Sequence, residues 1–326
     1  MKKVLITGGS GFIGTNLIDS LRNDEFLILN IDSKKPVIDV HLSYWQNINI
    51  LDYQKLAESI KSFAPDIIIH LAAVTDLNGT DLEYYKPNIE GTRNIIRIAA
   101  ELQDLKRVIF TSSMYVCKPG WIPKDYDSYK PHTVYGESKV KGEQIVKAIK
   151  NASYEWTIIR PTSIWGPWFD IPYIDFFKVV YSKRYFDFGK ACRKTYGFIG
   201  NTVAQIRILM DADNINKKTF YLGDDPPIQI SEWANEISVN MGKGRIRRTP
   251  YNLLKVAAVV GDTLSLLKIK FPLTSFRLKN MTTDNILPLK DLYEVTGQPV
   301  YSRKEGIQQT LNWLEKHKGY EINNPN

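Results

Sequence analysis

Short apolar runs alternate with longer amphipathic segments through the first half of the chain. The apolar runs cover residues 4–7, 26–31, 66–71, 107–111 and 156–160, and each has the length of a β-strand. Between them, residues 14–22, 88–102 and 135–150 place apolar side chains three or four positions apart, which is helical spacing. Strands that alternate with helices predict βαβ units with right-handed crossovers. We therefore expect an α/β fold built on a parallel sheet.

The pattern changes after Pro161, where aromatic density rises and the regular alternation ends. Residues 197–199 and 219–223 still have the pattern of sheet strands, and residues 231–241, 251–269 and 305–317 have helical spacing. We predict a first domain over residues 1–164, to which segments near 197–224 return. Residues 165–196 and 225–319 are expected to form a smaller, mostly helical substrate lobe, followed by a flexible tail over 320–326.

Composition and charge narrow the class of protein. The 326 residues are 43% hydrophobic and 24% charged, the balance of a soluble globular protein, and no apolar run is long enough for a transmembrane helix. The net charge of +8 is compatible with nucleic acid, an anionic membrane or a phosphorylated substrate. The basic residues are scattered, with small clusters at 243–248 and 268–279, and no nucleic-acid motif is present. A diphosphate substrate would explain the excess of basic residues. The alternative is a basic surface that is simply exposed to solvent.

Two further features bear on location. Residues 251–270 are amphipathic and basic at their end, which suits either a membrane-surface helix or a helix of the lobe, and we favour the lobe. Cys117 and Cys192 form neither a disulfide framework nor a zinc-ligand spacing, and the histidines show no metal-ligand pattern. The N-terminal apolar run is too short for a signal peptide. We expect a cytoplasmic protein without a metal.

A glycine-rich loop follows the first predicted strand. Gly8, Gly11 and Gly14 have the spacing G-x-x-G-x-x-G, between a strand and a helix that begins near Phe12 and Ile13. In this context the first glycine permits a tight turn, the second lets the backbone approach a pyrophosphate, and the third packs helix against strand. The helix N-terminus adds free N–H groups and the positive end of a dipole. The loop predicts a Rossmann-type, doubly wound dinucleotide-binding domain.

An acidic residue stands where the adenosine ribose of such a cofactor is expected. Asp32 ends the second predicted strand, 18 positions after Gly14, and its carboxylate can accept bonds from both ribose hydroxyls. Because this carboxylate would repel a 2′-phosphate, the sequence favours NAD. Ser33 and the two lysines after it could neutralise that phosphate, so NADP stays an open alternative. Asp52 is placed either to contact adenine or to cap a helix.

The candidate chemistry lies on the helix predicted over 135–150. Tyr135 and Lys139 stand at i and i+4, so they share one face, about 6 Å apart along the axis. A phenol titrates near pH 10, and a neighbouring ammonium together with an oxidised nicotinamide favours the phenolate. Tyr135 is therefore the candidate general acid and base. Ser113, at the end of an earlier strand, supplies a hydroxyl for the substrate oxygen, with Ser112 beside it.

These motifs occur in the order found in one family. The chain resembles the extended short-chain dehydrogenases/reductases, the NAD-dependent epimerase/dehydratase family, and is similar to UDP-glucose 4-epimerase and its relatives. The resemblance rests on residues 7–14, 70–73, 88–92, 110–113, 135–139 and 160–161, with later matches at 219–223, 231–233, 304–306 and 310–313. It therefore extends over nearly the whole chain.

The resemblance implies roles for individual residues. The catalytic roles fall on Ser113, Tyr135 and Lys139, and a supporting role falls on Asn88. The cofactor-binding set comprises Gly8, Gly11, Phe12, Ile13, Gly14, Asp32, Ser33, Asp52, Leu71, Ala72, Ala73, Asn88, Tyr135, Lys139 and Pro161. The substrate-binding candidates are Ser112, Ser163, Lys194 and Arg277. Relatives also pair through the helix that carries the lysine, which implies a homodimer.

Departures from the family pattern concern the substrate. Met114 and Tyr115 replace the Asp-Glu pair of 4,6-dehydratases, so the acids needed for water elimination are missing. Ser163 stands where sugar-nucleotide epimerases carry an asparagine, and Lys194 where an arginine is usual. We expect epimerisation at C4 of a nucleotide-activated hexose through a keto intermediate. The alternatives are an NAD(P)H-dependent reductase or dehydrogenase of a keto-sugar nucleotide or steroid-like alcohol, and a non-catalytic dinucleotide-binding regulator.

Overall fold

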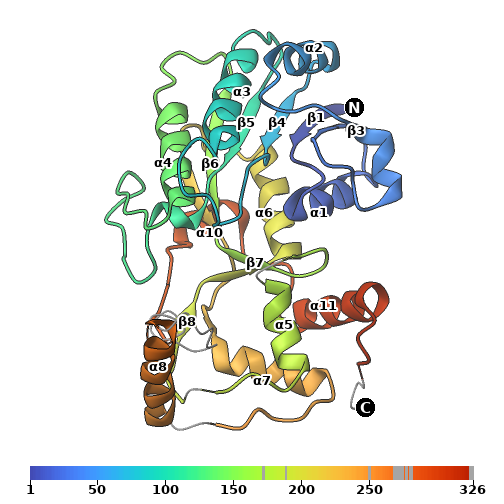
Figure 1. Ribbon diagram of the computed structural model, residues 1–326. Coiled ribbons are helices and arrows are strands. Elements are labelled where there is room, and N and C mark those ends of the chain that lie inside the picture. The colour runs from blue at the N-terminus through green and yellow to red at the C-terminus, as the bar shows by residue number, and fades with distance from the viewer. Residues whose placement is uncertain are drawn as a thin grey trace.

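The computed structural model describes residues 1–170, 173–187, 189–248, 251–266, 275, 278 and 282–322 (Figure 1). A seven-stranded parallel sheet forms the upper part of the molecule in this view, in the order β10-β6-β5-β4-β1-β2-β3. Its strands are β1 (Lys2–Thr7), β2 (Phe26–Ile31), β3 (Trp45–Gln46), β4 (Ile67–His70), β5 (Arg107–Thr111), β6 (Glu155–Pro161) and β10 (Thr219–Leu222). The chain moves outward from β1 in both directions, so the predicted doubly wound Rossmann-type α/β fold is confirmed.

Helices cover both faces of the sheet (Figure 1). One face carries α1 (Phe12–Leu21) and α6 (Ile199–Asp211), and the other carries α2 (Tyr53–Phe63), α3 (Thr92–Ala99) and α4 (Val134–Lys147). Successive strand residues point to opposite faces. Accordingly Val4 and Ile6 belong to the core under α1 and α6, whereas Leu5 belongs to the core under α2 and α3. Both faces are apolar, as a parallel sheet requires.

Most predicted elements of the first half occur within two or three residues of their predicted bounds, with one clear exception. The helix expected over 88–102 is a π-turn at Pro87–Gly91 followed by α3, which ends at Ala99. Several elements were not predicted, among them α2, β3 and α6. The two-residue strand β3 is too short to leave a periodic signal, and the strand expected at 197–199 reaches only the first residue of α6.

The lobe below the sheet contains mainly helices, as expected. They are α5 (Tyr173–Tyr181), α7 (Ile230–Asn240), α8 (Tyr251–Leu266) and α11 (Arg303–Lys318). A further helix, α10 (Lys290–Thr296), packs on α6 and β10 beside the main sheet (Figure 1). Two small two-stranded sheets join β7 (Ser163–Trp165) to β9 (Tyr196–Phe198), and β8 (Arg193–Lys194) to β11 (Ile228–Gln229). The strand predicted at 197–199 is thus β9, but it pairs with β7 outside the main sheet, because β10 occupies the place beside β6.

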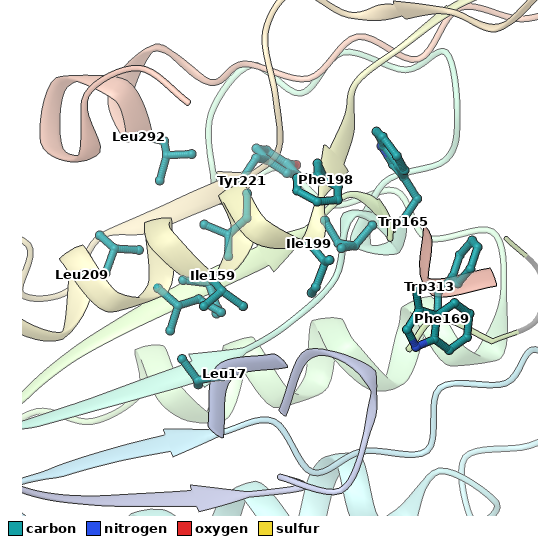
Figure 2. Packing of buried hydrophobic residues seen from close by; sticks show 14 of the residues in the cluster. Leu17, Ile159, Trp165, Phe169, Phe198, Ile199, Leu209, Tyr221, Leu292 and Trp313 are labelled. Atoms are coloured by element: carbon teal, nitrogen blue, oxygen red, sulfur yellow. The ribbon is translucent and has the colours of Figure 1, made fainter. Parts of the chain in front are cut away.

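An aromatic cluster forms the core of the lobe and joins it to the sheet (Figure 2). The Trp165 ring lies 5.1 Å from Trp233 and 6.2 Å from Phe177. Most of the aromatic residues that follow Pro161 therefore pack as core. The predicted tail begins at Tyr320, whose ring lies 4.5 Å from Tyr181 of α5, and residues 323–326 lie outside the described part of the chain.

Three findings concern membranes, thiols and metals. Among the described residues, no helix is both long and apolar enough to cross a membrane. Cys117 and Cys192 are both buried free thiols. Within the same described part of the chain, no group of three or more histidine, cysteine or acidic side chains is arranged to hold a metal ion.

Candidate functional site

The glycine loop has the geometry of a diphosphate cradle. Gly8 adopts a φ of +73°, and a Cβ on it would lie 2.5 Å from the backbone nitrogen of Ala72. Gly14 packs so closely that a Cβ would lie 2.5 Å from the Cα of Gly9. A Cβ on Gly11 would instead have the carbonyl of Gly8, at 3.3 Å, as its nearest described neighbour, and no side chain caps the start of α1 at this residue. The uncapped N–H groups beside Gly11 therefore fit the diphosphate of a dinucleotide.

Asp32 follows β2 directly and faces this loop. Its carboxylate accepts hydrogen bonds from the backbone N–H of Ser10 at 3.0 Å and of Lys34 at 2.8 Å. These bonds hold it beside the glycine turn, where a ribose hydroxyl is expected. Ser33 next to it is exposed. Asp52 caps α2, accepting from the Lys55 N–H at 3.3 Å, so its contact with adenine stays a prediction.

Asn88 connects the loop after β4 to α4. Its Oδ1 accepts from the N–H of Val74 at 2.8 Å, and its Nδ2 donates to the carbonyl of Val74 at 3.0 Å. The same Nδ2 lies 2.9 Å from the hydroxyl of Ser138, which donates to the carbonyl of Tyr135. Asn88 therefore joins this loop to α4, and its supporting role in the site stays a prediction. The segment Leu71–Ala73, expected to line the nicotinamide side, begins with a 2.9 Å bond from the Leu71 N–H to Thr7.

The catalytic candidates meet where β5 ends and α4 begins. Ser113 follows β5 and caps a 3₁₀ turn, accepting from the N–H of Tyr115 at 3.2 Å. Tyr135 and Lys139 occupy consecutive turns of α4, and both side chains are buried. The Lys139 ammonium donates to the carbonyl of Thr111 at 3.0 Å and lies 6.0 Å from the centre of the Tyr135 ring. The shared helix face predicted from the sequence is therefore present.

Burial controls the titration of this pair. Desolvation raises the pKa of Tyr135 to about 12, against the smaller lowering effect of a hydrogen bond with Ser113. Desolvation also lowers the pKa of Lys139 to about 8, although the carboxylate of Glu143 opposes that change. The direction for Tyr135 is opposite to the one expected from its lysine neighbour alone. The phenol of the protein by itself is consequently neutral near pH 7.

A buried ion pair continues the same helix face, and it was not predicted. Glu143, one turn after Lys139, accepts from Arg160 at 2.7 and 2.8 Å, and both side chains are buried. Arg160 holds the pKa of the Glu143 carboxyl below its ordinary value against the opposing effect of burial. The Tyr129 hydroxyl donates to the same carboxylate at 2.9 Å. The signal was present in the sequence, since Tyr135, Lys139 and Glu143 are spaced by four.

Aromatic side chains surround the catalytic phenol. The ring of Tyr85 lies 5.9 Å from that of Tyr135, and the ring of Tyr115 lies 5.8 Å from it. His132 stacks on the outer side of Tyr115 at 5.5 Å. The sequence placed His132 close to the site without giving it a role, and the geometry makes it a support for Tyr115. Together these rings keep water from the phenol, which explains the raised pKa.

The substrate candidates lie at different places. Ser112 is buried beside Ser113. Ser163, at the start of β7, is hydrogen-bonded to the hydroxyls of Tyr173 and Tyr196, two tyrosines that are electrostatically coupled to Tyr115. Pro161, a cofactor candidate, ends β6 just before it.

The other two candidates belong to the lobe. Lys194 lies on β8, in a bridge with Asn285, and the amide of Asn285 reaches the Sδ of Met114 at 3.9 Å. Since Met114 follows Ser113, this strand lies near the catalytic edge of the sheet. Arg277 lies outside the described residues. The substrate roles of all four candidates stay predictions.

Comparison with known proteins places this arrangement in context. Residues 4–176 match the model of a family described as the NAD dependent epimerase/dehydratase family. The chain is 26% identical over 325 residues to the N-acetyl-alpha-D-glucosaminyl-diphospho-ditrans,octacis-undecaprenol 4-epimerase of Escherichia coli O157:H7, with 96% of each protein covered. It is 27% identical over 254 residues to the UDP-glucose 4-epimerase of Vibrio cholerae, covering 74% of this chain and 76% of that protein.

Solved structures share the fold. The UDP-glucose 4-epimerase of Thermotoga maritima, solved with UDP-glucose, superimposes with a TM-score of 0.74 over 96% of this chain and 99% of that one, at 18% identity. At this identity the likeness concerns the arrangement of helices and strands. The lobe below the sheet is included in it, because the match extends over nearly the full length.

Proposed function

The chain belongs to the NAD-dependent epimerase/dehydratase family and is an NAD-dependent enzyme, and from this premise we propose that it epimerises C4 of an activated hexose through a keto intermediate. The observation that carries the proposal is the junction of β5 and α4, where the Ser113 hydroxyl, the Tyr135 phenol and the Lys139 ammonium converge. This set of groups suits proton transfer to and from a carbinol oxygen.

The glycine loop and the end of β2 account for cofactor binding. The N–H groups of Phe12 and Ile13, just after Gly11, would hold the diphosphate, and Asp32 would hold the adenosine ribose. Lys139 would hold the other ribose. When bound, NAD supplies the acceptor that takes a hydride from the carbinol carbon and returns it. The carboxylate of Asp32 favours NAD over NADP by charge, because a 2′-phosphate beside it would be repelled.

Tyr135 performs the proton chemistry at its hydroxyl. In the reducing direction, the neutral phenol gives its proton to the ketone oxygen without prior ionisation, as the pKa of about 12 permits. Giving up this proton leaves a phenolate, which the Lys139 ammonium stabilises. In the oxidising direction the phenolate takes the proton of the substrate hydroxyl and becomes the neutral phenol again. Ser113 positions the substrate oxygen by a hydrogen bond. The rings of Tyr85 and Tyr115 exclude water that would compete for the proton.

The carrier of the sugar has two candidates. A nucleoside diphosphate is our first choice, and Ser163, Lys194 and Arg277 are the candidate contacts of the activated sugar and its diphosphate. The second candidate is a polyprenyl diphosphate, favoured because the E. coli relative named for such a substrate matches 96% of the chain. Both carriers present a diphosphate next to the sugar, so the same cationic residues serve either.

Two alternatives to epimerisation make different use of Tyr135. A reductase or dehydrogenase of a keto-sugar nucleotide or steroid-like alcohol would use Tyr135 once per turnover and exchange its cofactor. A non-catalytic regulator would have no need of Tyr135. We do not propose a 4,6-dehydratase, since Met114 and Tyr115 stand in the place of its acid pair.

We further propose that the enzyme is a cytoplasmic homodimer. An open groove runs between α3 and α4 on the outer face of the sheet, and its apolar floor includes Ile89, Ile96, Ile145 and Ile149. A second copy of these helices would cover it. The domain division predicted from the sequence belongs to the same proposal, with residues 1–164 binding the dinucleotide and the lobe binding the sugar.

An isotope experiment tests the reaction. The purified enzyme is supplied with UDP-glucose or UDP-N-acetylglucosamine carrying deuterium at C4, and with the corresponding polyprenyl diphosphate sugar in detergent. We expect the C4 epimer of one carrier class to form with the deuterium kept at C4, as followed by NMR. Deuterium lost to free NADH would identify a dehydrogenase. Absence of turnover on every substrate, with NAD bound, would contradict the proposal.

A further inference from the structure

One face of α8 exposes valine side chains to solvent. Val256, Val259 and Val260 are 64%, 58% and 45% exposed, and they stand at i, i+3 and i+4, so they form one continuous patch. Ala258, on the inner side of the helix, is buried against Leu278. The helix is thus attached to the lobe by one face and offers a second apolar face outward, which an ordinary surface helix does not do.

A basic segment leads into this helix. Residues 242–248 connect α7 to α8 along the edge of the lobe farthest from the sheet (Figure 1), and they expose Arg245, Arg247 and Arg248. Lys255 adds an exposed cation on α8 itself. The acidic groups nearby are Asp187, which pairs with Arg248 at 3.6 Å, and Asp262, which accepts from the N–H of Ser275. Positive charge therefore predominates around the valine patch.

We infer that α8 and residues 242–248 dock the enzyme on an anionic lipid membrane, with the three valines inserted at the interface and the arginines at the phosphate groups. An interfacial helix needs a lipid-facing apolar strip flanked by cations, and both are present on one edge of the molecule. The net charge of +8 draws the whole protein toward the same surface. Lys255 stands one residue before Val256 and one turn before Val259, so at least one exposed cation lies beside the valines on the same helix.

Docking goes beyond the proposed reaction, because it requires neither a substrate nor turnover. It also places the lobe, the part expected to hold the sugar, against the bilayer. A substrate anchored by a lipid chain would meet the enzyme there, whereas a nucleotide sugar would arrive from solution. The two carrier candidates can therefore be separated by asking whether vesicles raise the rate.

Vesicle flotation of the full-length protein tests the inference. We expect binding to vesicles of phosphatidylglycerol and phosphatidylethanolamine, and little binding to phosphatidylcholine alone. The variant V256S/V259S/V260S should bind anionic vesicles at least about tenfold more weakly. The variant R245Q/R247Q/R248Q should lose about fivefold for each cation, and added salt should weaken the wild type in the same way.

A control variant shows whether the loss of vesicle binding is specific to the valines of α8. Val37, Val40 and Val300 are 61%, 48% and 64% exposed and lie away from α8, so V37S/V40S/V300S removes equal exposed apolar surface elsewhere. It should bind vesicles as the wild type does. The inference is overturned if the wild type does not bind anionic vesicles, or if the two valine variants bind equally well. It is also overturned if V256S/V259S/V260S alone lowers the mass of the particle in solution, since the patch is then a protein contact.

Turnover separates this inference from the proposed function. With a nucleotide sugar and no vesicles, V256S/V259S/V260S should turn over like the wild type, because no residue of the patch belongs to the site. Vesicle binding without epimerase activity would reject the reaction and leave the docking surface standing. Epimerase activity without vesicle binding would do the reverse.

Discussion

Helices α4 and α8 depart in opposite directions from the usual partition of polar and apolar side chains. On α4, a tyrosine, a lysine and a glutamate lie buried on successive turns, where apolar residues would be cheaper to accommodate. On α8, three valines lie exposed where polar residues would be more soluble. Burying the polar groups of α4 lowers the stability of the fold, and exposing the valines of α8 lowers the solubility of the protein. Such local inconsistencies mark the parts of a sequence that serve function rather than folding.

The two helices differ in how the cost is offset. The Glu143 carboxylate on α4 is paired with Arg160 and satisfied by Tyr129, so its burial is compensated inside the protein. The valines of α8 are exposed among the described residues, and the docking inference gives them a lipid surface as their partner. We interpret buried polar groups that are satisfied within the protein, as on α4, as a sign of catalysis. We interpret exposed apolar side chains, as on α8, as a sign of a binding surface.

The largest expected effect lies at the phenol. Tyr135→Phe removes the acid and base and leaves the ring packing of Tyr85 and Tyr115 in place. We expect turnover to fall at least about 10³-fold with NAD affinity unchanged, as measured by steady-state kinetics and cofactor titration. A variant that retains most of the wild-type turnover would remove Tyr135 from the mechanism. Unaltered far-UV circular dichroism serves as the folding control.

Removing the compensating cation should destabilise the protein strongly. Arg160→Met removes the two shortest bonds to the buried Glu143 carboxylate and leaves Lys147, at 3.6 Å, as its cationic partner. We expect the free energy of unfolding in urea to fall by about 3 kcal/mol. The double variant Glu143→Gln with Arg160→Met should recover part of this loss, because the buried carboxylate is then gone as well. A double variant as unstable as the single one would mean that Arg160 acts through packing alone.

Replacing Lys139 should raise the stability of the protein but lower its activity. Its pKa of about 8 in the folded protein lies below the ordinary 10.5, so the unfolded state binds the proton more tightly. Below pH 8 both states are protonated and the whole cost of burial is present. Between pH 8 and 10.5 that cost declines as pH rises. We therefore expect Lys139→Met to raise the free energy of unfolding by about 1–3 kcal/mol at pH 7, with no gain near pH 10.5.

The same Lys139→Met variant should lose turnover, since nothing then stabilises the phenolate. Unfolding curves at pH 7 and at pH 10.5 check the stability, and initial rates at pH 7 check the activity. An unchanged or lower stability at pH 7 would show that the bond to Thr111 outweighs the desolvation of the ammonium.

The smallest effect should belong to α8. Val256→Ser replaces an exposed methyl pair, and we expect the free energy of unfolding to change by no more than about 0.5 kcal/mol. Val203→Ser makes the same replacement at a buried position of α6 and should cost about 2 kcal/mol or more. Equal losses for the two variants, measured by thermal and urea unfolding, would mean that the valine patch is covered within the protein.

The sheet was predictable because its signals are local. Six of its seven strands were recognised from runs such as Ile67–His70, whose apolar residues are adjacent in sequence and buried on both faces. The glycine loop and the pair Tyr135 and Lys139 depend on spacing within one turn or one helix, and Asp32 and Ser113 on their places at the ends of predicted strands. The resemblance to a family added Asn88.

The remainder depends on contacts that spacing does not encode. The partner of β9 is decided by competition with β10 for the edge beside β6, which no local pattern reveals. Burial raises the pKa of Tyr135, with a smaller contribution from Tyr115 and Tyr85, 20 and 50 positions away, so the lysine alone predicted the wrong direction for the protein by itself. The pairing of Glu143 with Arg160 likewise joins a helix to a strand beyond it.

The return of the chain to the sheet also constrains synthesis on the ribosome. The nucleotide-binding sheet is completed only when β10 pairs with β6 and α6 packs on α1, and these elements end at residue 222. A nascent chain that has passed Pro161 therefore still presents an open sheet edge and an uncovered apolar face. At about 5–20 residues per second, the 61 residues from Pro161 to Leu222 leave these surfaces exposed for several seconds. Chaperone demand during translation should accordingly peak before the lobe has been made.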